Sequence, residues 1–332
     1  MKTLTNMLDR LQIGPARTFA GLTVYPLIGP DGLKPSYRTL DEALDEGSAR
    51  VTEVSQAGNV PELSFVNEGD RPVLLLDGEE LTGAKQNRVL NLTILAPAGK
   101  SIVIPVSCVE AGRWSSVSDR FAAAEHVMYS RGRGQKMAQV SGSMAMGGGR
   151  RSDQGAVWDG VQDLLCRQEV ASPSSRMHDV YRARRREVSE YVAAFPAVEG
   201  QVGAVFALAG RLRGVELFDC EETLRKLLPK LVRSWALDAL TLADRPCEVA
   251  PAEAVRSLLE EIGNCRMSVH DAVGLGQDVR FDSARLAGGV LVHEERVVHL
   301  CAFRMNGGDG GRACYDRMGR HMARASWRGR RR

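Results

Sequence analysis

The stretch "RPVLLLDGEELTGAKQNRVLNLTILAPAGKSIVIPVSCVE", residues 71–110, alternates short apolar runs with polar turns, and this pattern decides the fold class. Each run has the length of a β-strand and is rich in leucine, isoleucine or valine. Gly and Pro interrupt the runs in "APAGKS", as they do upstream in "VNEGDRP", which predicts tight turns. Pro105 lies inside a run and indicates a sheet edge or a bulge. The stretch therefore predicts antiparallel β structure.

The same pattern extends over residues 14–121, which we expect to form a β-rich, sandwich-like domain of antiparallel strands. Residues 152–305 mix helices with hairpins and are expected to pack on this first domain as an α+β part. The chain lacks the regular strand–helix alternation of a parallel sheet, so its predicted class is α+β. The predicted hairpins are "GAVFALAGRLRGVELF" and "GGVLVHEERVVHLCAFRM", and the predicted helices include "DCEETLRKLLPKLVRSWALDAL" and "PAEAVRSLLEEIG".

Two segments are predicted to be mobile because they are rich in Gly or Arg and have no apolar period. Residues 122–151 are predicted to be a linker or lid, with fast amide exchange expected over 141–151; residues 131–151 carry five positive charges and no acid. Residues 306–332 are predicted to be a disordered basic tail, since residues 312–332 contain eight arginines and one acid. Such a tail offers a site for nucleic acid.

The composition is that of a soluble globular protein: 332 residues, 44% hydrophobic and 26% charged, with a formal charge of +3. No apolar run approaches the roughly 20 residues that span a bilayer, so we expect no membrane span and a cytoplasmic location. The seven cysteines are scattered without paired short spacings, which predicts reduced structural thiols. Cys108 alternates with the apolar residues before it and is expected to face the core.

The connection "DGEELTGAKQNR" (77–88) is more polar than a link between two buried strands requires. Gly78 and Gly83 permit tight turns there. Basic side chains in it are suited to phosphate, and a carboxylate is suited to acid–base chemistry or to Mg²⁺. The alternative is a solvated hairpin tip with internal ion pairs. The polar residues are Asp77, Glu79, Glu80, Lys85, Gln86, Asn87 and Arg88.

A second polar cluster, "CVEAGRW", follows the next apolar run. An antiparallel hairpin through "APAGK" places this cluster beside the first, so we predict that Glu80, Arg88, Glu110 and Arg113 converge in one pocket. Trp114 is expected either to stack on a ring of the ligand or to cover the core. The candidate catalytic residues are Glu79, Glu80 and Glu110, and the candidate ligand-binding residues are Lys85, Gln86, Asn87, Arg88, Arg113 and Trp114.

Other residue types offer weaker signals. The six histidines, at 126, 178, 270, 293, 299 and 321, show no metal-ligand spacing, so a histidine metal site is not predicted. The metal requirement is left open, with Mg²⁺ as the ion suited to the carboxylates. Ser107 has no adjacent histidine and is not a predicted nucleophile. The run of arginines between Arg182 and Arg186 is interpreted as a solvated helix face, with RNA contact as the alternative.

The segment "PVLLLDGEELTGAKQNRVLNLTILAPAGKSIVIPVSCVEAGRW" resembles the core of the ARG and rhodanese-phosphatase-superfamily-associated protein domain. Weaker similarity extends over most of residues 15–245. The resemblance implies a link to NAD and ADP-ribose metabolism. It also implies that the motif residues form the site, namely Glu79, Glu80, Lys85, Gln86, Asn87, Arg88, Glu110, Arg113 and Trp114.

Three function classes follow from these observations. The first is an enzyme that hydrolyses or transfers a group on a phosphorylated nucleotide-type ligand, with a glutamate as general base or Mg²⁺ ligand. The second is a module that binds this small-molecule ligand without breaking a bond. The third is a nucleic-acid-binding protein that uses the basic tail.

Overall fold

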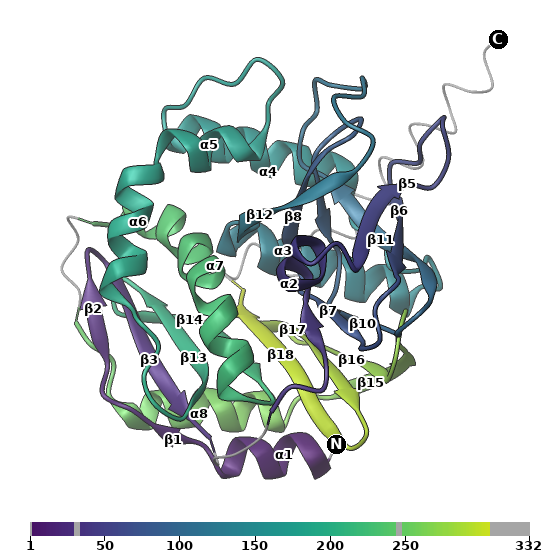
Figure 1. The fold of residues 1–332 in the computed structure, drawn as a ribbon. Helices are drawn as coiled ribbons and strands as arrows, with labels where there is room; N and C mark the ends of the chain where they lie inside the picture. The colour runs from purple at the N-terminus through teal and green to yellow at the C-terminus, as the bar shows by residue number, and fades with distance from the viewer. Residues whose placement is uncertain (1, 30–33, 244–247, 306–332) are drawn as a thin grey trace.

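The computed structural model describes residues 2–29, 34–243 and 248–305, and its elements form the predicted α+β fold (Figure 1). Six strands close into an antiparallel barrel in the order β11-β6-β5-β12-β8-β9. The strands form a closed barrel in place of the predicted open sandwich because β11 changes partner at Pro105. Its first part pairs with β6, and its last three residues pair with β9. The barrel strands are β5 (Ala49–Glu53), β6 (Glu62–Asn67), β8 (Glu79–Gly83), β9 (Arg88–Leu90), β11 (Ser101–Cys108) and β12 (Phe121–Val127).

A short helix and a small sheet complete the barrel's apolar core. Helix α2 (Leu40–Asp45) begins at Thr39 with a capping box, in which the Thr39 side chain and Glu42 bond to each other's backbone N–H. Leu40 and Ala43 of this helix are buried among the barrel residues, so α2 closes part of that core. The small sheet has the order β10-β7-β4, with β4 (Arg38–Thr39), β7 (Val73–Leu75) and β10 (Ile94–Ala96).

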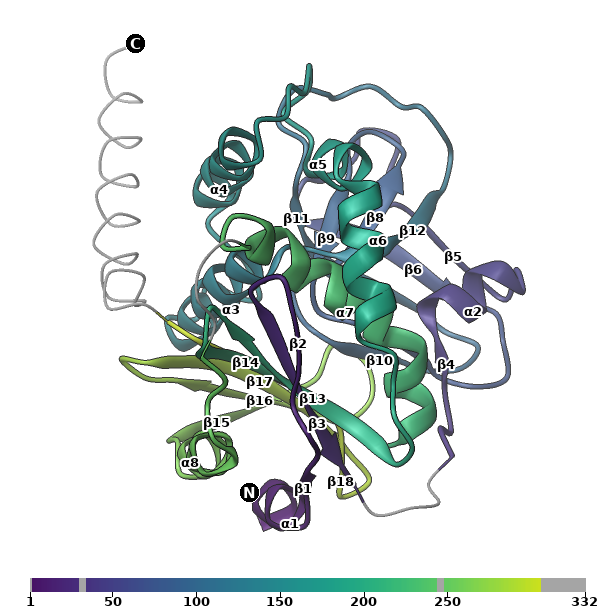
Figure 2. The same ribbon diagram turned by 90° about the vertical axis from the view of Figure 1, so that its left-hand side faces the viewer.

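A nine-stranded sheet forms the second layer, in the order β1-β3-β13-β14-β18-β17-β16-β15, with β2 paired to β3. All its pairs are antiparallel, and both faces are covered by helices. Figure 2 shows α7 over one face of the sheet and α1 and α8 over the other. In β13, Phe206 packs in the cluster that contains α7, whereas Val205 packs in the cluster of α1 and α8. The strands are β1 (Gln12–Ile13), β2 (Arg17–Phe19), β3 (Leu22–Ile28), β13 (Gln201–Leu208), β14 (Arg211–Phe218), β15 (Met267–Asp271), β16 (Gln277–Asp282), β17 (Leu286–His293) and β18 (Arg296–Arg304).

The two long helices and the two hairpins predicted for the second half of the chain are present in the structure. Helix α7 (Glu221–Leu240) contains Pro229, and α8 (Ala252–Gly263) follows Pro251, as expected for that sequence. The two predicted hairpins are β13–β14 and β17–β18. The remaining helices are α1 (Lys2–Asp9), α3 (Ser130–Ala145), α4 (Gln154–Arg167), α5 (Met177–Ala183) and α6 (Arg185–Ala194).

The predicted linker or lid over 122–151 is wrong, because strand β12 and helix α3 occupy most of it. Helix α3 is buried along most of its length and contacts β16, β17 and β18 of the large sheet as well as α7. The charged side chains Arg133 and Lys136 of this helix form ion pairs with buried carboxylates. The helix can therefore be buried although its sequence has no apolar stripe. Residues 141–145, for which fast amide exchange is predicted, lie at the end of this helix, and residues 141–143 are buried.

The predicted division at residue 121 also differs from the arrangement of the sheets. Strands β2 and β3 come from the first predicted domain, yet β3 pairs with β13 in the large sheet. The predicted basic tail, residues 306–332, lies outside the described residues. Among the described helices, none combines the length and the apolarity that a membrane crossing requires. The five cysteines in the described ranges are free thiols, and Cys108 is buried as predicted.

Candidate functional site

The two adjacent glutamates of the polar motif point to opposite sides of strand β8. Glu79 faces α7, where its Oε1 accepts a hydrogen bond from Lys230 Nζ at 2.8 Å. Its Oε2 accepts one from the backbone N–H of Leu76 at 2.8 Å. Burial raises the pKa of Glu79, although Lys230 opposes this shift. Glu79 thus joins the barrel to α7 and lies away from the other candidate residues.

Glu80 lies at the centre of a buried cluster with two histidines. Its Oε2 is 2.5 Å from His126 Nε2 on β12 and 3.4 Å from His178 Nδ1 on α5. One ligand atom from each of the three residues lies within 4.8 Å of the other two. Burial alone would raise the pKa of Glu80, but the hydrogen bonds and charges of the two imidazoles lower it to about 2. Glu80 is therefore an anion that two imidazoles share.

Local irregularities position the histidines. The β12–β8 ladder shifts register between Ala123 and Val127, and this bulge lies beside His126. His126 also stacks on Tyr181, with ring centroids 3.5 Å apart. Helix α5 starts where Met177 donates its N–H to the carbonyl of Val109, which holds His178 next to the end of β11. The two histidines therefore reach Glu80 from separate elements.

Glu110 and Arg113 form a closed ion pair. Glu110 accepts two hydrogen bonds from the Arg113 guanidinium, at 2.7 and 2.9 Å, one from Ser174 and one from the Asn87 backbone. These bonds outweigh the effect of burial and lower the pKa of Glu110. The remaining Arg113 N–H groups bind the carbonyls of the 83–84 turn and of Ser115. Both side chains are saturated, so the pair acts as a brace for the loop.

Asn87 connects this brace to Glu80. Its side-chain amide donates to Glu80 Oε1 at 2.9 Å, and its Oδ1 accepts from Arg113 at 3.3 Å. Its backbone N–H binds Glu110. Asn87 therefore links Glu80 with Glu110 and Arg113, as predicted, although Glu80 is fully buried and does not line a pocket with them.

Arg88 does not share this location, so that part of the prediction is wrong. It pairs with Leu81 in the β8–β9 ladder, and alternation places its side chain on the face opposite to Glu80, inside the barrel. Arg88 is fully buried, and its Nε donates to the carbonyl of Val60 at 3.2 Å. Its two terminal nitrogens have no hydrogen-bond partner among the described residues. Arg88 therefore places a polar guanidinium group at one end of the apolar barrel interior.

The other motif residues support the same region. Lys85 donates to the carbonyls of Gln56 and Ala57 at 2.6 and 2.7 Å. Trp114, 47% exposed, lies over the Lys85 ammonium and the Arg88 guanidinium at 5.5 and 5.6 Å from its ring centre. Gln86 donates to the Glu110 carbonyl at 2.9 Å. These contacts hold the loop and the end of the barrel together.

An open pocket of about 420 Å³ lies beside the Glu80 cluster, between α5 and the barrel. Arg176 and Arg182 both contact Asp179 Oδ1, at 2.7 and 3.2 Å. The pocket thus has three arginines against two carboxylates in its lining. The polar lining residues are Thr82, Asn87, Glu110, Arg113, Ser174, Arg176, His178, Asp179 and Arg182.

A second polar network is sealed between the barrel and the large sheet. Asp77 accepts from Lys136 and from Arg133, the latter at 3.2 Å, while Arg133 also binds Glu216 at 2.5 Å. Gly78 lets the Arg133 side chain pass, because a Cβ there would lie 2.9 Å from Arg133 Cδ. These side chains are fully buried, so Asp77 belongs to the interior and not to the pocket.

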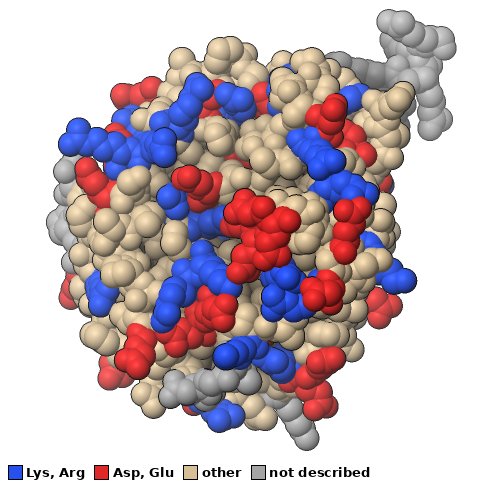
Figure 3. All heavy atoms as spheres, viewed as in Figure 1, with Lys and Arg blue, Asp and Glu red and all other residues tan. Residues whose placement is uncertain are grey.

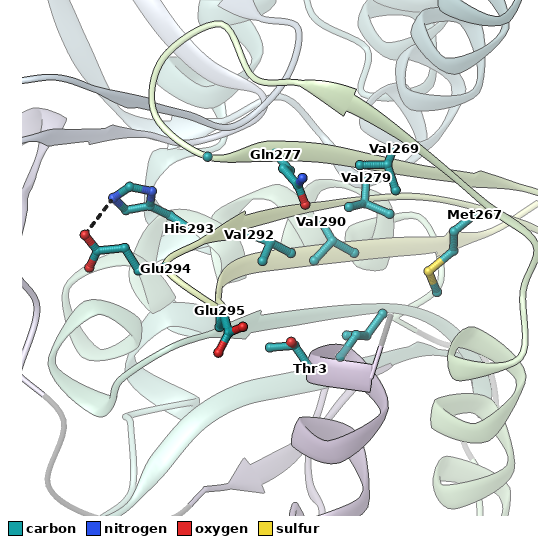
Figure 4. Close-up of a pocket in the computed structure, with 12 residues that line it drawn as sticks. Thr3, Met267, Val269, Gln277, Val279, Val290, Val292, His293, Glu294 and Glu295 are labelled. Carbon is teal, nitrogen blue, oxygen red and sulfur yellow. Dashed lines mark ion pairs between the residues drawn. The ribbon is translucent and has the colours of Figure 1, made fainter.

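A further cavity of about 400 Å³ lies between α1 and the large sheet (Figure 4). Most of its side chains are apolar, including Val279, Val290 and Val292. Its acid–base groups lie at one end, where His293 Nε2 is 3.7 Å from Glu294. It has no buried charged group and lies away from the polar motif, so it is a weaker candidate than the pocket beside Glu80.

The main residues that sequence reasoning missed are His126, His178 and Arg176. His126 follows a run of alanines in β12, and His178 lies in a short helix with one apolar face. Neither has a metal-ligand spacing to another residue. Glu80 was the only sequence signal for the cluster.

Comparison with known proteins agrees with the resemblance of the motif. A family model for the ARG and Rhodanese-Phosphatase-superfamily-associated Protein domain matches residues 10–303. No curated protein and no solved structure matches the chain. The match includes the barrel, α3, α5 and most of the large sheet, and thus every residue of the pocket. The chain belongs to the ARG and Rhodanese-Phosphatase-superfamily-associated Protein domain family.

Proposed function

We propose that the pocket between α5 and the barrel binds a phosphorylated, nucleotide-type ligand. The observation that carries the proposal is the pair Arg176 and Arg182, which share the single carboxylate of Asp179. One positive charge is therefore left uncompensated at the pocket. Arg176 Nε is also buried without a hydrogen-bond partner. A phosphate group supplies both the negative charge and the acceptors for such a guanidinium pair.

The rest of the pocket suits a ligand of this class. A volume of about 420 Å³ falls within the roughly 300 to 1,000 Å³ of small-molecule sites. Asn87 and Ser174 add polar groups to its wall, and the brace of Glu110 and Arg113 keeps that wall rigid. ADP-ribose or a related NAD derivative is the first candidate, because the family resemblance suggests it.

The charge distribution favours a small ligand over nucleic acid for the described part of the chain. On the face in Figure 3, Lys and Arg are interspersed with Asp and Glu, and a group of acidic side chains lies near its centre. Arg186, in the arginine run, pairs with Glu190 on its own helix at 3.7 Å. An extended basic surface is typical of a nucleic-acid-binding protein.

Calorimetric titration with ADP-ribose tests the proposal. Arg182→Ala and Arg176→Ala should each weaken binding about 10- to 100-fold, as loss of a hydrogen bond to a charged group does. Arg186→Ala is the matched control, because its side chain is 92% exposed and lies outside the pocket. Melting curves without ligand check that each variant is folded.

The outcome against the proposal is equal affinity in the two pocket variants and the control. Analysis of the ligand after incubation separates the two classes of function. An enzyme should convert ADP-ribose to products, and Glu80→Gln should abolish that conversion. A binding module should return the ligand intact.

A further inference from the structure

We propose that Glu80, His126 and His178 bind one divalent transition-metal ion at the base of this pocket. The three residues come from β8, β12 and α5, and their ligand atoms already lie within 4.8 Å of one another. Two imidazoles and one carboxylate are a common ligand set for catalytic zinc and for non-haem iron. The ion class is therefore Zn²⁺, Fe²⁺ or Mn²⁺.

The distances require only a small adjustment. Zinc lies about 2.0 to 2.2 Å from nitrogen and oxygen ligands, so two ligands of one tetrahedral ion are separated by roughly 3.4 Å. Glu80 Oε2 and His178 Nδ1 are already 3.4 Å apart. Glu80 Oε2 and His126 Nε2, at 2.5 Å, would separate by about 1 Å. An ion bound between Glu80 Oε2 and His178 Nδ1 would take the place of their ion pair, which has no hydrogen-bond geometry among the described residues.

A second layer of contacts orients the ligands. Asn87 donates to the other oxygen of Glu80 at 2.9 Å, and Asn87 is itself held by Glu110 and Arg113. The stack on Tyr181 fixes the His126 ring. Hydrogen-bonded carboxylates and oriented imidazoles are the usual outer shell of metal sites. The saturated brace in the polar motif thus has a role: it holds Glu80 through Asn87.

The site is open on one side. Glu80 and His126 are buried, whereas the His178 side chain is 35% exposed and lines the pocket. Three protein ligands with an open position are typical of catalytic metal sites, where water or substrate completes the coordination. Here a phosphate oxygen of the pocket ligand can take that position. The nearby cations Arg176 and Lys230 are paired with Asp179 and Glu79.

A second group of residues that could bind a metal consists of Glu216, His299 and Cys301. It differs from the Glu80 group in its exposure, in its existing partners and in the lack of an open coordination position. All three residues are buried, and Glu216 already binds Arg133 and His299. The other ring nitrogen of His299 lies 2.8 Å from Thr93 Oγ1. No ligand position is left open there, and the Arg133 guanidinium already supplies the positive charge. The contrast favours the Glu80 group alone as the metal site.

Metal binding can be tested on the full chain without any phosphorylated ligand. Protein treated with a chelator is dialysed against Zn²⁺, and bound metal is counted by elemental analysis, with Fe²⁺ and Mn²⁺ in parallel. His178→Ala should weaken binding at least tenfold and lower the stoichiometry by one ion. It should keep the fold, because His178 is partly exposed. His270→Ala, a partly exposed histidine on β15 that lies outside the cluster, is the matched control.

Thermal melts provide the second readout. Zn²⁺ should raise the melting temperature of the native protein and of the control, but not of His178→Ala. Equal metal content in His178→Ala and the control would overturn the proposal, as would the absence of bound transition metal in the native protein. A preference for Mg²⁺ over Zn²⁺ would also overturn it, since Mg²⁺ favours oxygen ligands.

The metal site deepens the proposed function, and only its contact with phosphate rests on that function. Titration of metal-free protein with ADP-ribose tests the arginines alone, whereas dialysis tests the metal ligands alone. A failure of one proposal is therefore distinguishable from a failure of the other. If both hold, Zn²⁺ should raise the affinity of the native protein for ADP-ribose, and His178→Ala should remove that increase.

Discussion

The buried pair of Asp77 and Lys136 should be among the most sensitive points of the fold. Both side chains are fully buried; Lys136 also donates to the carbonyls of Leu90 and Asn91 at 2.9 and 3.1 Å. In Asp77→Asn, the Lys136 ammonium keeps its hydrogen bonds to these two carbonyls but loses the carboxylate that neutralises its charge. Removing one partner of a buried pair costs about 3 to 5 kcal/mol, a large part of a typical total stability of about 5 to 15 kcal/mol.

The double variant Asp77→Asn, Lys136→Met separates charge balance from packing. Each single change strands a charge, whereas the double variant strands neither side chain of the pair. Its loss should therefore be no larger than either single loss, and well below the sum of the two. Urea unfolding followed by tryptophan fluorescence, to which Trp235, buried against Phe206, contributes, measures all three variants. Single losses below about 1 kcal/mol, or additive losses, would refute the reasoning.

Three further predictions concern the barrel end, the brace and the large sheet. Arg88→Ala should leave ADP-ribose affinity unchanged, because Arg88 lies inside the barrel; a tenfold loss in titration would contradict this. Glu110→Gln should lower the free energy of unfolding by about 2 to 4 kcal/mol at pH 7. Since the pKa of Glu110 is lowered in the fold, that difference should shrink as urea melts are taken below pH 4.5. Gly288→Ala should cost about 1 to 3 kcal/mol because a Cβ would overlap the Phe281 ring. Gly263→Ala, whose Cβ would make only an ordinary contact with Leu8 at 3.6 Å, should melt like the native protein.

The hairpins and the long helix can be predicted from sequence because their signals are local. The β13–β14 turn contains Ala209 and Gly210, both with positive φ, between two apolar runs. Helix α7 presents a continuous stripe from Leu224 to Trp235, and this stripe packs on the large sheet. In both cases the chain's own pattern determines the element.

Helix α3 cannot be predicted in this way, since its burial depends on partners far away in the sequence. Arg133 and Lys136 are polar in sequence but lie in the interior because Asp77 and Glu216 neutralise them. The glycines of this helix allow close packing, as at Gly134 against Phe303. The result is a buried helix with the composition of a linker.

The candidate site shows the same division. Its local part, Glu80 with the 83–87 turn, follows from the motif and its position between two strands. Its distant part, His126 and His178, depends on a bulge in β12 and on the start of α5. A histidine cluster formed by three separate elements leaves no spacing in the sequence.

The pairing of β3 with β13 has a consequence for the order in which the protein folds during synthesis. All six barrel strands are available once residue 127 has been made, but β3, complete at residue 28, has only the short strands β1 and β2 to pair with until β13 begins at residue 201. At about 5 to 20 residues per second, the delay is on the order of 10 to 35 s. During that time the apolar side chains of β3, such as Tyr25 and Leu27, lack the later strands and helix α8 among which they are buried in the folded protein. We therefore expect the barrel strands to pair on the ribosome first, while the amino-terminal strands remain open to chaperones until β13 emerges.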